Sequence, residues 1–116
     1  MVFVSRSAAI DTDTVDVACS IGMTDGTRSR SVGTSSDDGS LADNALRKAR
    51  NDSIALVWNA DDGTIMLRGT FAQWITDGIR ITWDWTGAGT ALFFHVLLFG
   101  GSDLTAYVDD FSVLSG

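Results

Sequence analysis

The chain of 116 residues contains no proline and no glutamate, one cysteine and one histidine. The single Cys19 excludes an intramolecular disulfide and a zinc cluster built from cysteines, and it favours folding in a reducing cytosol. Without glutamate, the chain lacks the calcium-binding loop that ends in a glutamate ligand. Without proline, the edges of a sheet need other protection, either charged residues such as Arg28 and Arg30 or pairing with neighbouring subunits.

Positive charge is also scarce, because eight Lys and Arg residues stand against fifteen acidic residues, which gives a net charge of −7. Such a surface repels phosphate backbones and anionic lipids, so we expect neither nucleic acid nor a membrane as a partner. The first residues carry no basic leader before a long apolar run, so we expect no secretion signal. With 45% hydrophobic residues, the chain is predicted to bury one core in a single domain over residues 1–116.

No apolar run reaches the roughly 20 residues that a membrane-spanning helix needs. The longest run, ALFFHVLLF from Ala91, ends in glycines and holds the only histidine, His95. Apolar residues at both alternating positions predict a central strand that is buried on both faces. Because its neighbours along the strand are apolar, we expect His95 to be hydrogen-bonded within the sheet or at a subunit contact. We expect no catalytic residue, no enzymatic activity and no cofactor.

Asp-Gly pairs recur along the chain and predict hairpin turns between short segments rich in β-branched and aromatic residues. The predicted strands are residues 2–4, 15–23, 28–33, 54–58, 64–73, 79–85, 92–99 and 105–113. About eight strands indicate an all-β fold, an antiparallel β-sandwich that is jelly-roll-like in the broad sense. Residues 40–51 are the exception, because helix formers after a candidate N-cap at Ser40 predict a short helix or a long loop.

Clustered carboxylates raise the hypothesis of a calcium site. The pairs are Asp11 and Asp13, Asp37 and Asp38, Asp61 and Asp62, and Asp109 and Asp110. Three of these pairs lie beside turns or strand ends, which favours solvated turn carboxylates, and we expect no metal. Cys19 alternates with Val17 and Ile21, which predicts a small core residue.

The chain has four tryptophans, at positions 58, 74, 83 and 85. Exposed aromatic rings stack on sugar rings, so a lectin-like carbohydrate-binding module, with a host-receptor glycan as ligand, is one alternative function. Trp83 and Trp85 share a strand face with Ile79 and Ile81, where core packing or a subunit interface explains them equally well. Trp74 lies just before a predicted turn, where we expect it to be exposed. The candidate binding residues are therefore Trp74 and Trp85.

Three blocks of sequence carry a family resemblance. They are IGMTDGTRSRSVG at 21–33, WITDGIRITWDWT at 74–86 and LFFHVLLFGGSDL at 92–104. Together they resemble a β-sandwich module of predicted virion structural proteins of tailed bacteriophages. Asp84 and Trp85 depart from that pattern, because they are inserted between its expected tryptophan and threonine.

The resemblance implies a non-enzymatic virion protein, assembled in the host cytoplasm, that acts in capsid decoration or as a fibre or tail component. It implies contacts with copies of the same chain and with other virion proteins, and it assigns no catalytic residues. Modules of this kind have further strand sequence upstream of the matched blocks. We therefore expect a partner chain to complete the sandwich by adding a strand to an exposed edge.

Overall fold

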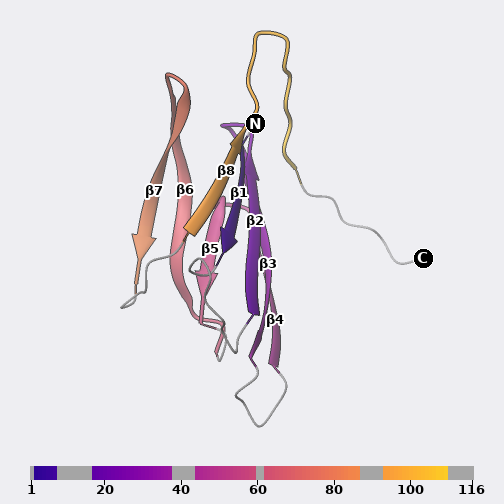
Figure 1. Cartoon of the computed structure of the whole chain (residues 1–116), viewed down its shortest axis with the longest axis vertical. Helices are drawn as coiled ribbons and strands as arrows, with labels where there is room; N and C mark the ends of the chain where they lie inside the picture. Colours follow the sequence, from indigo (N-terminus) through magenta and orange to yellow (C-terminus); the bar gives the residue numbers. More distant parts are fainter. Residues whose placement is uncertain (1, 8–16, 38–43, 60–61, 87–92, 110–116) are drawn as a thin grey trace, which may run out of the picture.

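The computed structural model describes residues 2–7, 17–37, 44–59, 62–86 and 93–109, and these form strands joined by turns and loops. The strands are β1 (Val2–Ser7), β2 (Val17–Thr24), β3 (Ser29–Asp37), β4 (Asn44–Arg50), β5 (Ala55–Trp58), β6 (Ile65–Ile75), β7 (Gly78–Trp85) and β8 (Phe93–Leu98). They make one sheet in the order β4-β3-β2-β1-β8 and a second in the order β5-β6-β7. Every pairing is antiparallel, and Figure 1 shows the two layers beside each other.

The all-β prediction is confirmed, and two antiparallel sheets are consistent with the predicted sandwich. The jelly-roll connectivity and the strand count for the whole chain stay predictions. Two Asp-Gly pairs form the expected tight hairpins, at Gly26 between β2 and β3 and at Asp77 between β6 and β7. Both residues have a positive φ, 95° and 60° respectively, which is the conformation that such turns require.

The prediction of a helix or loop over residues 40–51 is wrong for residues 44–50, which form β4. The segment pairs with β3 over its whole length, from Asp37 opposite Asn44 to Ser31 opposite Arg50. The helix propensity of Ala, Leu, Lys and Arg is a weak preference, and the unpaired backbone groups of β3 outweigh it. Residues 40–43 lie outside the described part of the chain.

Two further expectations about the five-stranded sheet are corrected. The strand around His95 is not central, because β8 is the last strand of its sheet and pairs only with β1 among the described strands. Cys19 is exposed rather than a core residue. Cys19 and Ile21 share one face of β2, as the alternation predicted. That face points away from β5, so it is the outer face of the sheet and not the core.

The described part of the predicted strand at 105–113, residues 105–109, is not a strand. Side chains of the β2–β3 hairpin hold it instead. The carboxylate of Asp25 accepts a hydrogen bond from the backbone N–H of Val108 at 3.0 Å, and the guanidinium of Arg28 lies 4.3 Å above the ring of Tyr107. Val108 is consequently buried.

The core is centred on β5, in which all four residues are buried together with the preceding Ile54. Val2 of β1 packs against Ile54 and Ala55, and Ile79, Ile81 and Phe94 pack around this cluster. Each large apolar side chain that is fully buried contributes about 1.5 to 3 kcal/mol. A strand of four residues, at the contact between the two sheets, therefore supplies much of the apolar stabilisation.

β5 approaches the first sheet closely because the inward positions of β2 and β3 carry only small side chains. These positions are Ser20, Gly22, Thr24, Ser31, Gly33 and Ser35. A Cβ atom on Gly22 would overlap the backbone carbonyl of Ile54, and one on Gly33 would overlap the indole ring of Trp58. The absence of a side chain at both positions thus sets the distance between the sheets.

Hydroxyl groups satisfy the polar atoms that this contact buries. The Ser20 hydroxyl donates to the backbone carbonyl of Leu56 at 2.9 Å, and the indole N–H of Trp58 donates to Ser35 Oγ at 2.8 Å. The hydroxyls of Ser31 and Ser53 share a third buried hydrogen bond at 2.9 Å. The two sheets are therefore joined by hydrogen bonds as well as by apolar packing.

Replacing Gly22 by Ala is expected to lower the free energy of unfolding, because the new methyl group collides with the Ile54 backbone. We expect a loss of about 3 kcal/mol or more, at or above the upper end for an overpacked core, measured by urea unfolding. The matched control is Gly100→Ala, because nothing lies within 4 Å of a Cβ at Gly100. Equal stability of the two variants would contradict the close contact of β5 with β2.

Candidate interaction surface

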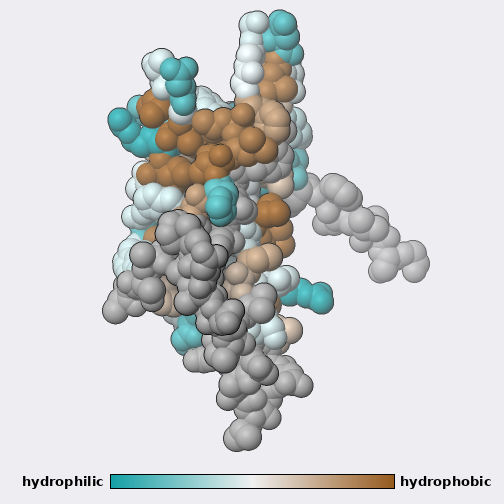
Figure 2. Space-filling model, viewed as in Figure 1, coloured by the Kyte–Doolittle hydropathy of each residue, from teal (hydrophilic) through white to brown (hydrophobic). Residues whose placement is uncertain are grey.

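The exposed apolar residues gather at one side of the molecule. Most of the large hydrophobic side chains that remain exposed lie at the end of β6, on β7, and on or just after β8. We call this set the β7–β8 surface: Trp74, Ile75, Trp83, Trp85, Val96, Leu97, Leu98 and Phe99. Figure 2 shows a broad apolar area where Figure 1 draws the upper parts of β6, β7 and β8. A large exposed apolar area is typical of an interaction site.

The register of β8 assigns its residues to two faces. Val96 lies opposite Val4, which lies opposite Gly22, so Val96 is on the face directed toward the second sheet. Leu98 and Phe94 are on this inward face too. His95 and Leu97 are on the outward face, in rows that continue through β1 to Ile21 and Met23 of β2. β8 therefore presents apolar side chains on both faces at the edge of its sheet.

β7 lies across from β8 in the other sheet. The indole of Trp83 packs against the ring of Phe94, with 4.8 Å between ring centroids. The same indole covers Gly69 of β6, where a Cβ would come within 2.7 Å of the ring. Ile79 and Ile81 are partly buried on the same face, while Trp83 and Trp85 remain more than 40% exposed. The two sheets are thus in contact at this side, but they leave much of its apolar surface uncovered.

The two edges of the five-stranded sheet differ in charge. β4, at one edge, has the sequence NALRKAR, with three positive side chains at Arg47, Lys48 and Arg50. β8, at the other edge, has the sequence FFHVLL and no Lys, Arg, Asp or Glu. Lysine and arginine at an edge discourage pairing with another chain. Only the β4 edge has this protection.

His95 is exposed on the outward face of β8. The expectation of a hydrogen bond within the sheet stays a prediction, because the side chain of Ser5, directly opposite His95, lies outside the described part. The alternative expectation, a subunit contact, is untested and fits its position on an edge strand. No carboxylate of the described residues pairs with it as an acid–base partner.

Trp74 is 46% exposed and packs on Phe71, with 5.1 Å between ring centroids. It borders a hollow of about 490 Å³ that Asp25, Phe99 and Leu104 also line. The Asp25 carboxylate accepts hydrogen bonds from three backbone N–H groups, those of Thr27, Arg28 and Val108. Its oxygens therefore hold the turn together.

Trp85 lies at the other end of the second sheet. It pairs with Leu67, whereas Trp74 pairs with Ile79 near the β6–β7 turn. Ile79 and Trp85 are six positions apart on β7, a distance of about 20 Å along a strand. The two tryptophans predicted as binding residues do not form one site. The sequence prediction missed Val96, Leu97 and Leu98 as surface residues, since their pattern matched that of a buried strand.

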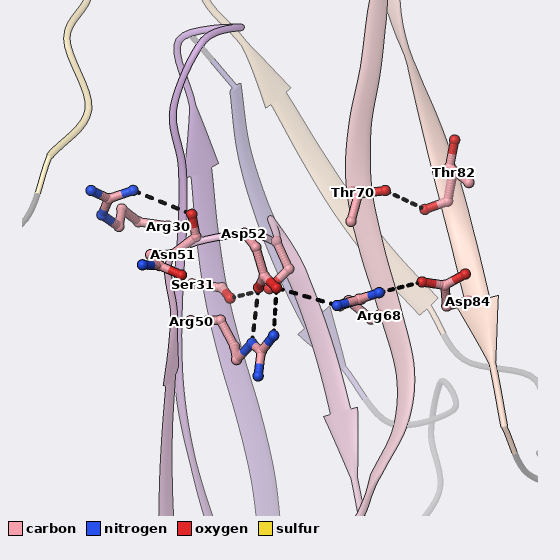
Figure 3. A network of polar contacts seen from close by, with 10 residues as sticks. Arg30, Ser31, Arg50, Asn51, Asp52, Arg68, Thr70, Thr82 and Asp84 are labelled. Carbon is pink, nitrogen blue, oxygen red and sulfur yellow. Dashed lines mark hydrogen bonds and ion pairs between the residues drawn. The ribbon is translucent and has the colours of Figure 1, made fainter.

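A polar network lies beside Trp85, between β4 and the second sheet (Figure 3). Asp52 accepts hydrogen bonds from Arg50 of β4, including one from Nε at 2.8 Å, and from Arg68 of β6 at 3.2 Å. Arg68 also donates to Asp84 of β7 at 2.6 Å. The four charges compensate one another and tie β4 to the second sheet. Because each side chain is about one-third exposed or more, each pair contributes at most about 1 kcal/mol.

Among the residues that the structure describes, no three His, Cys or Asp side chains cluster as metal ligands. Of the acidic pairs, Asp11, Asp13, Asp38, Asp61 and Asp110 lie outside the described residues. Asp62 is a turn carboxylate, because it accepts the backbone N–H of Thr64 at 2.8 Å. In the same described ranges, no helix has the length and apolar character needed to cross a bilayer.

Comparison of the chain with protein-family models, with curated proteins and with solved structures gives no match. The functional argument therefore rests on the β7–β8 surface and on the contrast between the two edges of the five-stranded sheet.

The free energy of unfolding is expected to fall in acid. Hydrogen bonds from the backbone of Arg28 and from the Arg50 side chain hold the pKa of Asp25 and of Asp52 below the usual value of 3.8. The unfolded state then binds more protons, so this stabilisation is complete above about pH 5 and is lost as the pH falls through the lowered pKa values.

Urea unfolding from about pH 6 down to about pH 2.5 measures this loss. The double variant Asp25→Asn/Asp52→Asn is expected to lose less stability in acid than the wild type. Asp103→Asn, at an exposed position, serves as the control and should follow the wild type. An acid profile that is identical in the double variant would contradict a role for these two carboxylates.

Proposed function

We propose that this protein is a non-enzymatic structural component of a tailed-bacteriophage particle, which assembles through contacts with copies of itself and with other virion proteins. The observation that carries the proposal is the uncovered, charge-free apolar strand β8 at the edge of an otherwise acidic protein. The role would be capsid decoration or a fibre or tail component, in a virion assembled in the host cytoplasm.

Physical considerations support an assembly role for this surface. Monomeric proteins seldom leave a long apolar edge strand open, because it pairs with other chains. Tryptophan and phenylalanine, which are enriched at protein interfaces, are present here as Trp83, Trp85 and Phe99. The resemblance of three sequence blocks to phage virion modules supports the same proposal independently. A partner that adds a strand at β8 would extend the jelly-roll-like sandwich beyond one chain.

One observation favours a second candidate function, a carbohydrate-binding module. Trp74 exposes nearly half of its surface beside a hollow, as a ring that stacks on a sugar must do. Sugar recognition also needs polar groups directed at hydroxyls, and the nearest carboxylate, Asp25, already accepts three backbone hydrogen bonds. This second candidate is therefore weaker than the assembly role.

The assembly proposal predicts that the purified protein self-associates with rising concentration or binds to phage particles. Analytical ultracentrifugation measures the first, and co-sedimentation with purified tailed-phage particles from the virus that encodes the chain measures the second. Mass spectrometry should also detect the chain in those particles. A protein that stays monomeric at high concentration and is absent from the particles would rule the proposal out.

The carbohydrate alternative predicts binding on a glycan array that Trp74→Ala reduces by about tenfold or more, since stacking on an aromatic ring is worth on the order of 1 to 2 kcal/mol. Tyr107→Ala, at a more exposed aromatic residue away from this hollow, is the control. Under the assembly proposal, the array shows no binding and Trp74→Ala has no effect on sugar affinity. Strong glycan binding that depends on Trp74 would favour the second candidate.

A further inference from the structure

We infer that β8 pairs with β8 of a second copy of this chain, antiparallel and about a two-fold axis, so that the two five-stranded sheets become continuous. The inference rests on the proposed assembly function and names its partner and its geometry. Four observations carry it: the open backbone edge, the apolar character of both faces of β8, the lack of charge along the strand, and the charged residues at the opposite edge.

The chemistry of the edge selects a strand as the occupant. β8 hydrogen-bonds to β1 on one side, from Val2 opposite Leu98 to Ser7 opposite Phe93. The backbone groups of alternate residues point to the other side, where no described strand pairs with them. A fully paired backbone there requires an added extended strand, because only a strand presents donors and acceptors at the same spacing.

The side chains select a second copy as the source of that strand. A matching strand must carry apolar residues on both faces, since Val96 and Leu98 line the inward face and Leu97 the outward face of β8. β8 itself meets this requirement. The net charge of −7 makes two copies repel each other elsewhere, whereas at β8 neither copy carries an acidic side chain. Pairing at this edge therefore joins the copies where their electrostatic repulsion is smallest.

The register of such a pair is restricted by symmetry. In an antiparallel pair, the backbone N–H and C=O groups of two opposed residues either both point toward the other strand or both point away. Neighbouring residues point in opposite directions, so a residue cannot be opposed to its own neighbour. A two-fold axis must therefore pass beside one residue that is opposed to the same residue of the second copy. To use the full length of β8, that residue must be either His95 or Val96, the two central positions of the strand. Each choice places the opposed Cα atoms about 4.5 to 5.5 Å apart.

Cysteine cross-linking tests the register directly. The exposed Cys19 is first replaced, because it would form competing disulfides. In a Cys19→Ser background, we expect His95→Cys or Val96→Cys, but not both, to form a disulfide-linked dimer under mild oxidation, since only the residue beside the axis has the required separation. Val32→Cys, at an exposed apolar position of the interior strand β3, is the control. Cross-linking in neither edge variant, or equally in all three, would overturn the inference.

Charge placed on the outward face of β8 tests the pairing itself. In His95→Lys/Leu97→Lys, lysines oppose lysines in either register, so we expect the dimer dissociation constant to rise by about tenfold or more. The control Val32→Lys/Thr34→Lys adds the same charge at exposed positions of β3, away from β8, and should dimerise like the wild type. Sedimentation equilibrium gives both constants, and circular dichroism verifies that each variant is folded.

The outcomes separate this inference from the proposed function. A wild type that associates while the double-lysine variant associates equally well would overturn β8 pairing and leave assembly through another surface. A monomeric wild type that still binds phage particles would also overturn β8 self-pairing alone, with a virion protein as the partner. A monomer that binds no particle would overturn both proposals.

Discussion

The backbone of β5 lies directly against the faces of β2 and β3, and the arrangement of both sheets follows from this contact. It requires a column of small residues, with Gly22 beneath Ile54 and Gly33 beneath the Trp58 ring. Serine hydroxyls between these glycines bond to the buried polar atoms of β5. A single larger side chain in this column would push the sheets apart and expose the core centred on β5.

Because β5 occupies the position over β2, the rest of its sheet extends toward β8 on the far side. There β7 meets β8 through Trp83 and Phe94, the side chains are large, and apolar surface is left exposed. The two sheets thus pack closely where Gly and Ser of β2 and β3 meet β5. Around β7 and β8 they leave Trp, Leu and Phe side chains exposed. The two edges of the five-stranded sheet differ as well, since the β4 edge carries Arg and Lys and the β8 edge does not.

The elements that the sequence predicted well are those with local signals. Alternation in GIRITWDW matched β7, and Asp-Gly pairs marked the turns at Gly26 and Asp77 because both need a positive φ. β4 was missed because helix formers dominate its composition, and only the edge of β3 made it a strand. Periodicity alone does not distinguish a strand inside a sheet from an apolar strand at its edge, which is why the run around His95 predicted a central strand.

The candidate site was even less accessible from the sequence. Trp74 and Trp85 were chosen for their chemistry, but the register separates them to opposite ends of β7. The aliphatic residues Val96 to Leu98 form the larger exposed surface, and their exposure depends on which strands lie beside them. A signal was present in the contrast between FFHVLL and NALRKAR, but it has meaning only once both are known to be edges of one sheet.

Hydrogen exchange of the backbone amides, followed as protein concentration rises, tests the central claim most directly. If the open edge of β8 is the assembly surface, alternate amides of Phe93 to Leu98 become protected as the copies associate, while the amides of β4 at the opposite edge exchange at an unchanged rate. Association without added protection in β8, or with protection in β4 instead, would contradict the account.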